Sequence, residues 1–338
     1  MDGMERLQFA ALILPSEFAR EAKRPEGMSH LSPIAGKSLH EWVIDAALGA
    51  SVRRVAVVSP TPADALSDDL ASRPDDMLIS VVSPAANVLA TVEAAIEGLG
   101  TDFIFRDTSH VLLLSESCPQ IRSTDLRRII DHHVESCASV TTCAGEVEHD
   151  HTEPVITRDR HGRVASITDV AVGGGAIACF RAEVLVPALR RSARGSTFQG
   201  IAADVASVLG DAGHRVETLD YPGPLEIVRS GASRTTVEAT LRQRVIKDWI
   251  ERGVVMADPA QVTIDATVHL GKGVEVLPGT VIEGRTIVAD GARIGPNSHL
   301  VDAVIGSSAE VPHSVVRGVE VPPRSVLTPF SVLGPSAD

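Results

Sequence analysis

The chain has 338 residues, a length that allows two domains, each with its own hydrophobic core. Apolar residues make up 44% of it and aromatic residues only 3%, so core packing must rest on aliphatic side chains. The formal net charge of −13 argues against a nucleic-acid partner, because contact with a phosphate backbone requires a basic face.

The first part of the chain alternates between short apolar runs and segments with helical periodicity. The apolar runs predict strands over 7–14, 53–59, 77–82 and 110–114. The helical patterns predict helices over 38–50, 62–72, 87–99 and 123–137. Asn87 and Ser123 are the residue types that cap helix N-termini, and we expect them to do so here. Such alternation indicates parallel βαβ units with helices on both faces of one sheet.

Shorter elements follow this alternating part. The pattern predicts strands over 138–144, 153–158, 163–168, 175–180, 215–220 and 225–229. Two helices are predicted over 181–191 and 201–211, and a long one over 235–252. Beyond the long helix the helical period stops and a period of six begins. We therefore predict an α/β domain over 1–230, a helical connecting arm over 231–260 and a separate domain over 261–338.

Residues 261–338 repeat in steps of six. One aliphatic residue recurs on a single register, with one-residue contractions towards its end: Ile264, Leu270, Val276, Ile282, Val288, Ile294, Leu300, Ile305, Val311, Val316, Val321, Leu327 and Leu333. A small or β-branched residue follows four positions after each of the first six: Val268, Val274, Thr280, Thr286, Ala292 and Ser298. This repeat is typical of a parallel β-helix, in which stacked coils bury what one hexad cannot. A β-sandwich of short strands is the alternative.

Two segments carry a resemblance to a known family. PIAGKSLHEWVIDAALGASVRRVAVV, which begins at Pro33, resembles the segment after the nucleotide loop of bacterial N-acetylglucosamine-1-phosphate uridylyltransferases. The stretch from Arg242 to Gly306, RQRVIKDWIERG…LVDAVIG, is similar to the arm and first coils of the same family. The resemblance implies a nucleotidyltransferase-like (GT-A/Rossmann-like) α/β domain followed by a short left-handed parallel β-helix of hexapeptide repeats. It also implies a homotrimer formed through the β-helix.

The family's enzymes are bifunctional: one domain joins UTP to N-acetylglucosamine-1-phosphate, and the β-helix acetylates glucosamine-1-phosphate with acetyl-CoA. The first reaction needs a Gly-rich loop around the phosphates, basic side chains and Mg²⁺ held by a carboxylate. The family's loop reads roughly L-x-x-G-x-G-T-R-M, followed by a Lys. In this chain other residues stand at the two glycines, the Arg and the Lys: Glu17, Ala19, Glu21 and Met28 or Ser29.

The other family motifs have changed as well. Ser117 stands where the family has the metal-binding Asp, with Glu116 beside it. The family's Asn-Ala-Gly motif aligns with a segment that starts at Gly174. The motif with the second metal ligand, Asn-Asp-Arg, aligns with Ala232, Ser233 and Arg234. Val88 to Ala90 stand near the Gly-Thr-Gly of another motif. The sequence therefore predicts that the uridylyltransferase site is degraded.

A rebuilt site is the alternative. Arg20, Lys23 and Arg24 are the candidate residues for a nucleotide loop, and Glu116 and Asp107 are the candidate metal ligands. No cofactor is predicted unless the chain is an active nucleotidyltransferase, which would require Mg²⁺. The family's acetyltransferase residues follow a Pro-Phe-x-x-Leu-Arg-Pro segment. Here Gly334 replaces that Arg and the sequence ends at Asp338, so we expect no acetyltransferase site.

Two hypotheses follow for function. The first is a non-catalytic relative that binds a small phosphorylated ligand or a partner enzyme. The second is an active, divergent enzyme that joins a nucleoside triphosphate to a sugar-1-phosphate and releases pyrophosphate. Function has to be argued from the site and not from the fold, and the concerted changes favour the first hypothesis.

Three further features bear on chemistry and location. Glu148 to His151 (EHDH) has metal-ligand residue types, but its polar surroundings favour a solvated loop. Cys118 has no recognisable His and acid partner, so a small buried side chain is the better interpretation. The four cysteines form no CxxC pair, no apolar run approaches the length of a membrane span, and MDGMERLQF lacks a signal-peptide pattern. We expect a cytoplasmic protein.

Overall fold

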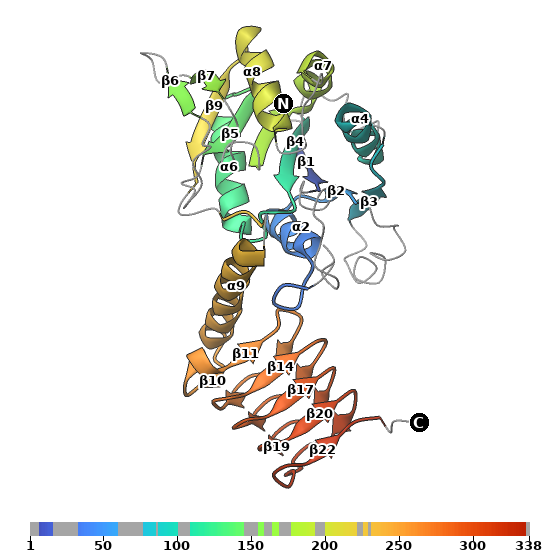
Figure 1. Cartoon of the computed structure of the whole chain (residues 1–338), viewed down its shortest axis with the longest axis vertical. Coiled ribbons are helices and arrows are strands. Elements are labelled where there is room, and N and C mark those ends of the chain that lie inside the picture. The colour runs from blue at the N-terminus through green and yellow to red at the C-terminus, as the bar shows by residue number, and fades with distance from the viewer. Residues whose placement is uncertain are drawn as a thin grey trace, which may run out of the picture. The chain divides into compact units, whose positions relative to one another are not determined.

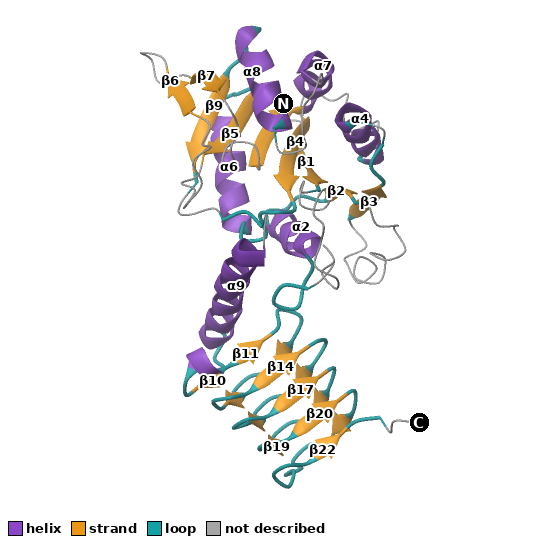
Figure 2. Cartoon of the chain, viewed as in Figure 1, coloured by secondary structure: helices purple, strands orange, loops and turns teal. Residues whose placement is uncertain are grey.

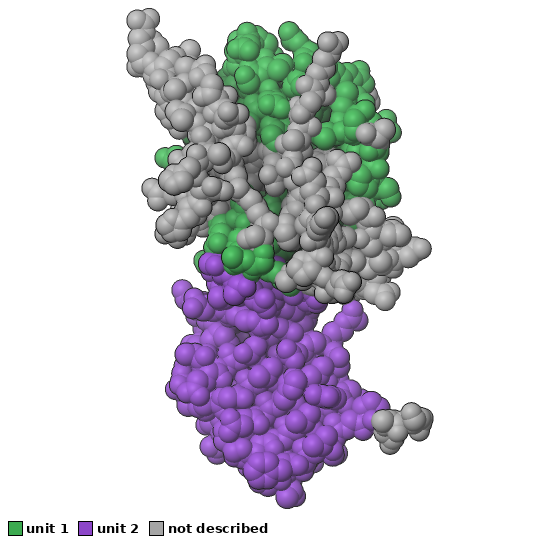
Figure 3. Space-filling view, viewed as in Figure 1, with its two compact units in different colours: residues 1–30, 39–234 green, residues 31–38, 235–338 purple. Residues whose placement is uncertain are grey.

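The structure is a computed structural model, and it describes residues 7–15, 33–59, 77–85, 87–100, 109–144, 155–158, 164–168, 177–192, 200–221, 226–228 and 231–335. The chain divides into two compact units, coloured separately in Figure 3. The first comprises residues 1–30 and 39–234, and the second comprises residues 31–38 and 235–338. The short segment 31–38 thus belongs to the same unit as the C-terminal residues, which the periodicity of the sequence does not predict. The predicted helix over 62–72 lies outside the described residues.

The first unit is built on a seven-stranded sheet in the order β3-β2-β1-β4-β8-β5-β9 (Figure 1). Its strands are β1 (Gln8–Leu14), β2 (Arg54–Val58), β3 (Leu78–Val82), β4 (Ser109–Ser115), β5 (Val140–Ala144), β8 (Ile177–Arg181) and β9 (Val216–Asp220). All neighbouring pairs are parallel except those of β8, which runs antiparallel to β4 and β5. A separate hairpin pairs β6 (Val155–Arg158) with β7 (Val164–Thr168).

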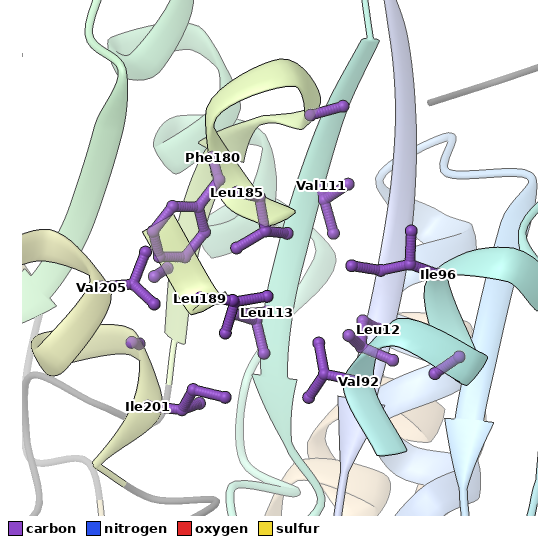
Figure 4. Packing of buried hydrophobic residues seen from close by; sticks show 14 of the residues in the cluster. Leu12, Val92, Ile96, Val111, Leu113, Phe180, Leu185, Leu189, Ile201 and Val205 are labelled. Atoms are coloured by element: carbon purple, nitrogen blue, oxygen red, sulfur yellow. The ribbon is translucent and has the colours of Figure 1, made fainter. Parts of the chain in front are cut away.

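Helices cover both faces of this sheet, as the alternating pattern predicts (Figure 2). One core lies between the sheet and helices α4 (Val88–Gly98), α7 (Ala182–Ser192) and α8 (Ile201–Asp211); Figure 4 shows its side chains, among them Leu12, Val92 and Phe180. The other core lies against α2 (Leu39–Gly49) and α6 (Ser123–Glu135). Side chains alternate along β1, so Leu12 enters the first core and Ile13 the second.

Local details confirm some of the predicted boundaries and correct others. Asn87 caps α4 as predicted, with its side-chain oxygen accepting from the Ala90 amide at 2.9 Å. Ser123 does not cap α6: it is the first helical residue, and the N-cap is Arg122, whose amide donates to the Asp125 carboxylate. The strand predicted over 225–229 is wrong for residues 226–228, which are described as irregular chain.

The second unit contains a parallel β-helix whose strands form three sheets, β10-β13-β16-β19, β11-β14-β17-β20-β22 and β12-β15-β18-β21 (Figure 1). The strands are β10 (Val255–Met256), β11 (Thr263–Ile264), β12 (His269–Leu270), β13 (Glu275–Val276), β14 (Val281–Glu283), β15 (Ile287–Val288), β16 (Arg293–Ile294), β17 (His299–Val301), β18 (Val304–Ile305), β19 (Glu310–Val311), β20 (Val315–Arg317), β21 (Glu320–Val321) and β22 (Val332–Leu333). Each strand pairs in parallel with its equivalent in the next coil, for example Ile264 with Ile282.

The predicted register is the core of this β-helix. Its aliphatic residues from Ile264 to Val321 are buried, as are all six of the small residues beside them. Leu327 and Leu333 are only half-buried. The sequence period therefore identified which side chain of each strand points inward.

Glycines at the corners of the coils allow the next coil to pack closely against them. Gly284 has a φ of +68°, and a Cβ placed on it would collide with the Asp302 carboxylate of the following coil. That carboxylate accepts a hydrogen bond from the Arg285 amide at 2.8 Å. Gly271 stands in the same way against Asp290, which accepts from the Lys272 amide at 2.7 Å. A corner thus pairs a glycine that has no room for a side chain with an acidic residue from the next coil.

Helix α9 (Gly231–Glu251) precedes the β-helix, and a short 3₁₀ turn (Pro259–Gln261) leads into the first coil. The apolar side of α9 is buried, including Leu241, Val245 and Trp249. The Trp249 ring meets the His269 ring edge-on, with centroids 5.9 Å apart, and the Arg252 guanidinium lies over its face. None of the described helices is both long and apolar enough to cross a membrane.

Candidate functional site

The strand order places a candidate site at the carboxyl ends of β1 and β4. Strands β2 and β3 are added in sequence on one side of β1, and β4 is added on its other side. The strand order therefore reverses between β1 and β4. Ligands of open α/β sheets bind at such a reversal, in the crevice beyond the strand ends. The two ends are joined here by a hydrogen bond of 3.0 Å from the Glu116 amide to the Leu14 carbonyl.

Glu116 is fully buried and faces His40 at this strand end. The distance from His40 Nε2 to Glu116 Oε2 is 2.5 Å, and the two side chains are 2% and 0% exposed. His40 lies in the first turn of α2, on the stripe that also carries Val43, Ile44 and Ala47 into the core. The packing of α2 on the sheet therefore brings the imidazole to the carboxylate, and each offsets the cost of desolvating the other.

The hydroxyl groups on either side of Glu116 are also buried. Ser115 and Ser117 are 7% and 1% exposed, and their Oγ atoms lie 2.6 Å apart. The Ser117 carbonyl accepts a hydrogen bond of 2.9 Å from the Val228 amide. The two serines therefore face each other in a neutral hydroxyl pair at the position where the resemblance implies a metal-binding Asp.

This arrangement does not fit a bound Mg²⁺. A hard cation needs carboxylate oxygens that it can reach together with water, whereas the Glu116 carboxylate has no exposed surface and lies against His40. Among the described residues, no group of three His, Cys, Asp or Glu side chains is arranged to hold a metal ion. Asp107, the other candidate ligand, lies outside the described residues.

The remaining predicted positions are divided between described and undescribed parts of the chain. Ala232 and Ser233 lie in the first turn of α9, with Ala232 exposed and Ser233 half-exposed. Leu89 lies in the first turn of α4, packed against the core. The nucleotide-loop candidates and the other changed positions lie outside the described residues: Glu17, Ala19, Arg20, Glu21, Lys23, Arg24, Met28, Ser29 and Gly174. Residues 148–151 lie outside them too.

His40 was not among the predicted site residues, although the spacing of its helix carries a signal. His40, Val43, Ile44 and Ala47 follow the i, i+3, i+4, i+7 spacing of a buried helix face. A histidine on such a stripe is expected to meet a polar group in the core, and the Glu116 carboxylate lies against its Nε2 atom. Cys118, predicted to be a small buried side chain, is 1% exposed.

One groove lies elsewhere in the first unit, along the outer side of α6. It has a volume of about 530 Å³ and is lined by Thr124, Arg127, Arg128, Asp131, His132, Glu135 and Leu219. The Arg127 guanidinium donates a hydrogen bond to the Gly49 carbonyl. Two guanidinium groups and two carboxylates line the groove together, so it favours neither an anionic nor a cationic ligand.

Comparison with known proteins finds relatives that are similar over nearly the whole chain. No family model matches the chain. The bifunctional protein GlmU of Geobacillus sp. (strain WCH70) is 25% identical over 346 residues, which cover 98% of this chain and 72% of that protein. The GlmU proteins of Kineococcus radiotolerans and Carboxydothermus hydrogenoformans are 29% and 24% identical, over 90% of this chain in each case and 65% and 69% of their own lengths.

The similarity therefore extends across both units and is not confined to the repeats. The chain spans about two thirds of the length of these relatives. It combines an α/β unit with a parallel β-helix in the order that the resemblance implied. The chain is thus similar to bifunctional GlmU proteins over nearly its whole length, at 24–29% identity.

Proposed function

We propose that this chain is a non-catalytic relative of the sugar-1-phosphate nucleotidyltransferases, which binds a phosphorylated ligand or a partner without transferring a nucleotidyl group. The observation that carries the proposal is the carboxyl end of β4. There Ser117 replaces the implied Asp, and the neighbouring Glu116 carboxylate is buried against His40 at 2.5 Å.

The chemistry of the reaction explains why these residues matter. An in-line attack on the α-phosphate depends on positioned cations that neutralise the charge of the triphosphate. A serine hydroxyl is neutral and cannot replace a carboxylate as a ligand for Mg²⁺. Losing one preorganised electrostatic partner typically costs about 10²–10³ in rate. Ala232 and Ser233 stand at the implied second metal motif and provide no carboxylate, so a second metal ligand is missing as well.

The proposal is tested by separating ligand binding from turnover. The purified chain is titrated with Mg²⁺–UTP, with N-acetylglucosamine-1-phosphate and with a panel of other nucleotides and sugar phosphates, by calorimetry. Pyrophosphate release is then measured with the same panel, and an active uridylyltransferase of the family serves as the positive control. We expect no pyrophosphate release above background for any pair. Release with any nucleotide and sugar phosphate would instead establish the active, divergent enzyme.

We further propose that the chain forms a homotrimer through its β-helix. Ile287 and Val304 are neighbours in register on the outer side of the sheet β12-β15-β18-β21, and they are 48% and 42% exposed. Large apolar side chains next to each other on a sheet face are characteristic of a subunit contact. This pair supports an assembly that uses this face of the β-helix.

A further inference from the structure

Residues 33–38, which belong to the second unit although they precede α2, form a closed turn. The Ile34 amide donates to the Lys37 carbonyl at 2.7 Å, and the Lys37 amide donates back to the Ile34 carbonyl at 3.2 Å. The two central residues, Ala35 and Gly36, have φ values of +48° and +86°, which is the pattern of a type I′ turn. A left-handed alanine is unfavourable by about 1 kcal/mol or more, so the surroundings must hold it in place.

The surroundings that hold it are the first coil of the β-helix. The Ala266 amide donates to the Ala35 carbonyl at 2.8 Å. Gly36 lies over Asp265 so closely that an added Cβ would stand 2.5 Å from the Asp265 Cβ and 3.0 Å from Thr267 Oγ1. Ile34 and Ala35 are 0% and 1% exposed. The turn is therefore packed against the coil and is not a surface loop.

These contacts repeat the geometry of the β-helix corners. At the same corner in later coils, the Asp302 amide donates to the Glu283 carbonyl and the Gly318 amide to the Val301 carbonyl. In each case a corner amide meets the carbonyl of the residue before the corner one coil earlier, and Ala266 meets Ala35 in the same way. A left-handed glycine lies over an aspartate in both places, Gly36 over Asp265 and Gly284 over Asp302. The register differs by one residue, because Ala266 and not Asp265 is the equivalent of Asp302.

We infer that residues 33–38 act as an additional corner at the start of the β-helix, which caps its first coil. A parallel β-helix has unpaired backbone groups at its first coil, and such edges must be covered. Here a segment distant in the sequence covers one corner.

Asp265, which lies against Gly36, also contacts the next coil and α9. Its side chain is 12% exposed, and its carboxylate accepts a hydrogen bond of 3.2 Å from the Gly284 amide and lies 3.5 Å from an Arg242 Nη atom. Arg242 is in turn paired with Glu238 at 2.8 Å within α9. The residue under Gly36 is thereby fixed to the next coil and to the helical arm, which makes the corner a rigid platform.

The test is hydrogen exchange on full-length variants, followed by mass spectrometry. In Gly36→Ala the new methyl group collides with Asp265, so we expect the turn to leave the first coil. The amide of Ala266 should then exchange about tenfold faster or more. Peptides from the later coils, such as 299–317, should keep theirs.

Gly273→Ala is the matched control. Gly273 also has a left-handed φ, of +66°, but nothing lies within 4 Å of an added Cβ. It therefore introduces the backbone strain of the substitution without a collision, and it should leave the Ala266 amide protected. The inference fails if Gly36→Ala retains wild-type exchange at Ala266, or if Gly273→Ala exposes that amide equally. Both outcomes are independent of whether the chain turns over a nucleotide.

Discussion

At the scale of single residues, the pair His40–Glu116 is the most buried polar contact at the end of β4, with side chains 2% and 0% exposed. A carboxylate with no exposed surface is costly unless a partner compensates its lost hydration. His40 compensates it at 2.5 Å, and the same contact directs the carboxylate inward. The buried carboxylate next to Ser117 therefore lies against α2 of the same unit.

This pairing predicts a marked dependence of stability on both residues. His40→Leu or Glu116→Leu leaves one buried polar partner without the other, and each should lower the free energy of unfolding by about 3–5 kcal/mol. The double variant removes both polar groups together, so its loss should be smaller than the sum of the single losses. Urea unfolding at pH 7 measures all three variants. Additive losses would contradict a direct coupling between the side chains.

At the scale of elements, a second buried polar cluster joins β4, α6 and β5. His133 of α6 has its Nδ1 2.8 Å from the Thr141 hydroxyl of β5 and its Nε2 3.2 Å from His110 Nδ1 of β4. The His110 ring is stacked on Phe9 of β1. Burial, aided by the Arg181 charge, lowers the pKa of His110 to about 4. Burial lowers the pKa of His133 to about 3, aided by His110, Arg181 and His132.

These lowered pKa values predict a loss of stability in mild acid. The unfolded chain takes up protons at its histidines near pH 6.5, while His110 and His133 in the folded chain stay neutral until about pH 4 and 3. Unfolding is therefore coupled to proton uptake between those limits, and stability falls as the pH falls. The pair should cost roughly 2–4 kcal/mol between pH 7 and pH 5. Urea unfolding over this pH range measures the slope.

A comparison of variants assigns that slope to the cluster. In His133→Gln an amide can keep the contact with Thr141 but does not titrate, so the decline in stability between pH 7 and pH 5 should become clearly smaller. His214→Gln changes an exposed histidine and should keep the wild-type slope. An unchanged slope in His133→Gln would show that the acid sensitivity arises elsewhere in the chain.

At the scale of the whole molecule, the proposed trimer makes a prediction about mass. The wild-type chain should show about three times its monomer mass of 35.6 kDa by size-exclusion chromatography with light scattering. Ile287→Glu places a charge on the proposed contact face, where burial of an unpaired carboxylate is unfavourable. We expect this variant to dissociate to monomers at micromolar concentration while its β-helix remains folded.

Val255→Glu is the matched control for that prediction. Val255 is 57% exposed but belongs to the sheet β10-β13-β16-β19, a different side of the β-helix. Its substitution should leave the trimer intact. A wild-type chain that is monomeric, or a trimer that survives Ile287→Glu, would overturn the assignment of this face.

The sequence by itself determined the elements whose order is local. The period of six predicted the β-helix and its inward residues from Ile264 to Val321, because each coil is buried by the coils nearest to it in the sequence. Alternating strand and helix patterns likewise predicted the layered α/β unit. The errors occurred where a short sequence pattern is compatible with several structures. Ser123 begins α6 without capping it, and residues 226–228 form no strand, although Ile227 is in the core and the Val228 amide donates to the Ser117 carbonyl.

Only the tertiary structure decided the contacts between distant residues. The family motif made Glu116 a candidate metal ligand and Ser117 a changed position. The burial of the Glu116 carboxylate depends on which face of α2 packs on the sheet, and the sequence does not show this. The docking of the turn at Ala35 and Gly36 onto Asp265 has no counterpart in any sequence period. Both contacts are made by residues far apart in the chain, whose meeting is fixed by packing of the whole core and not by local propensity.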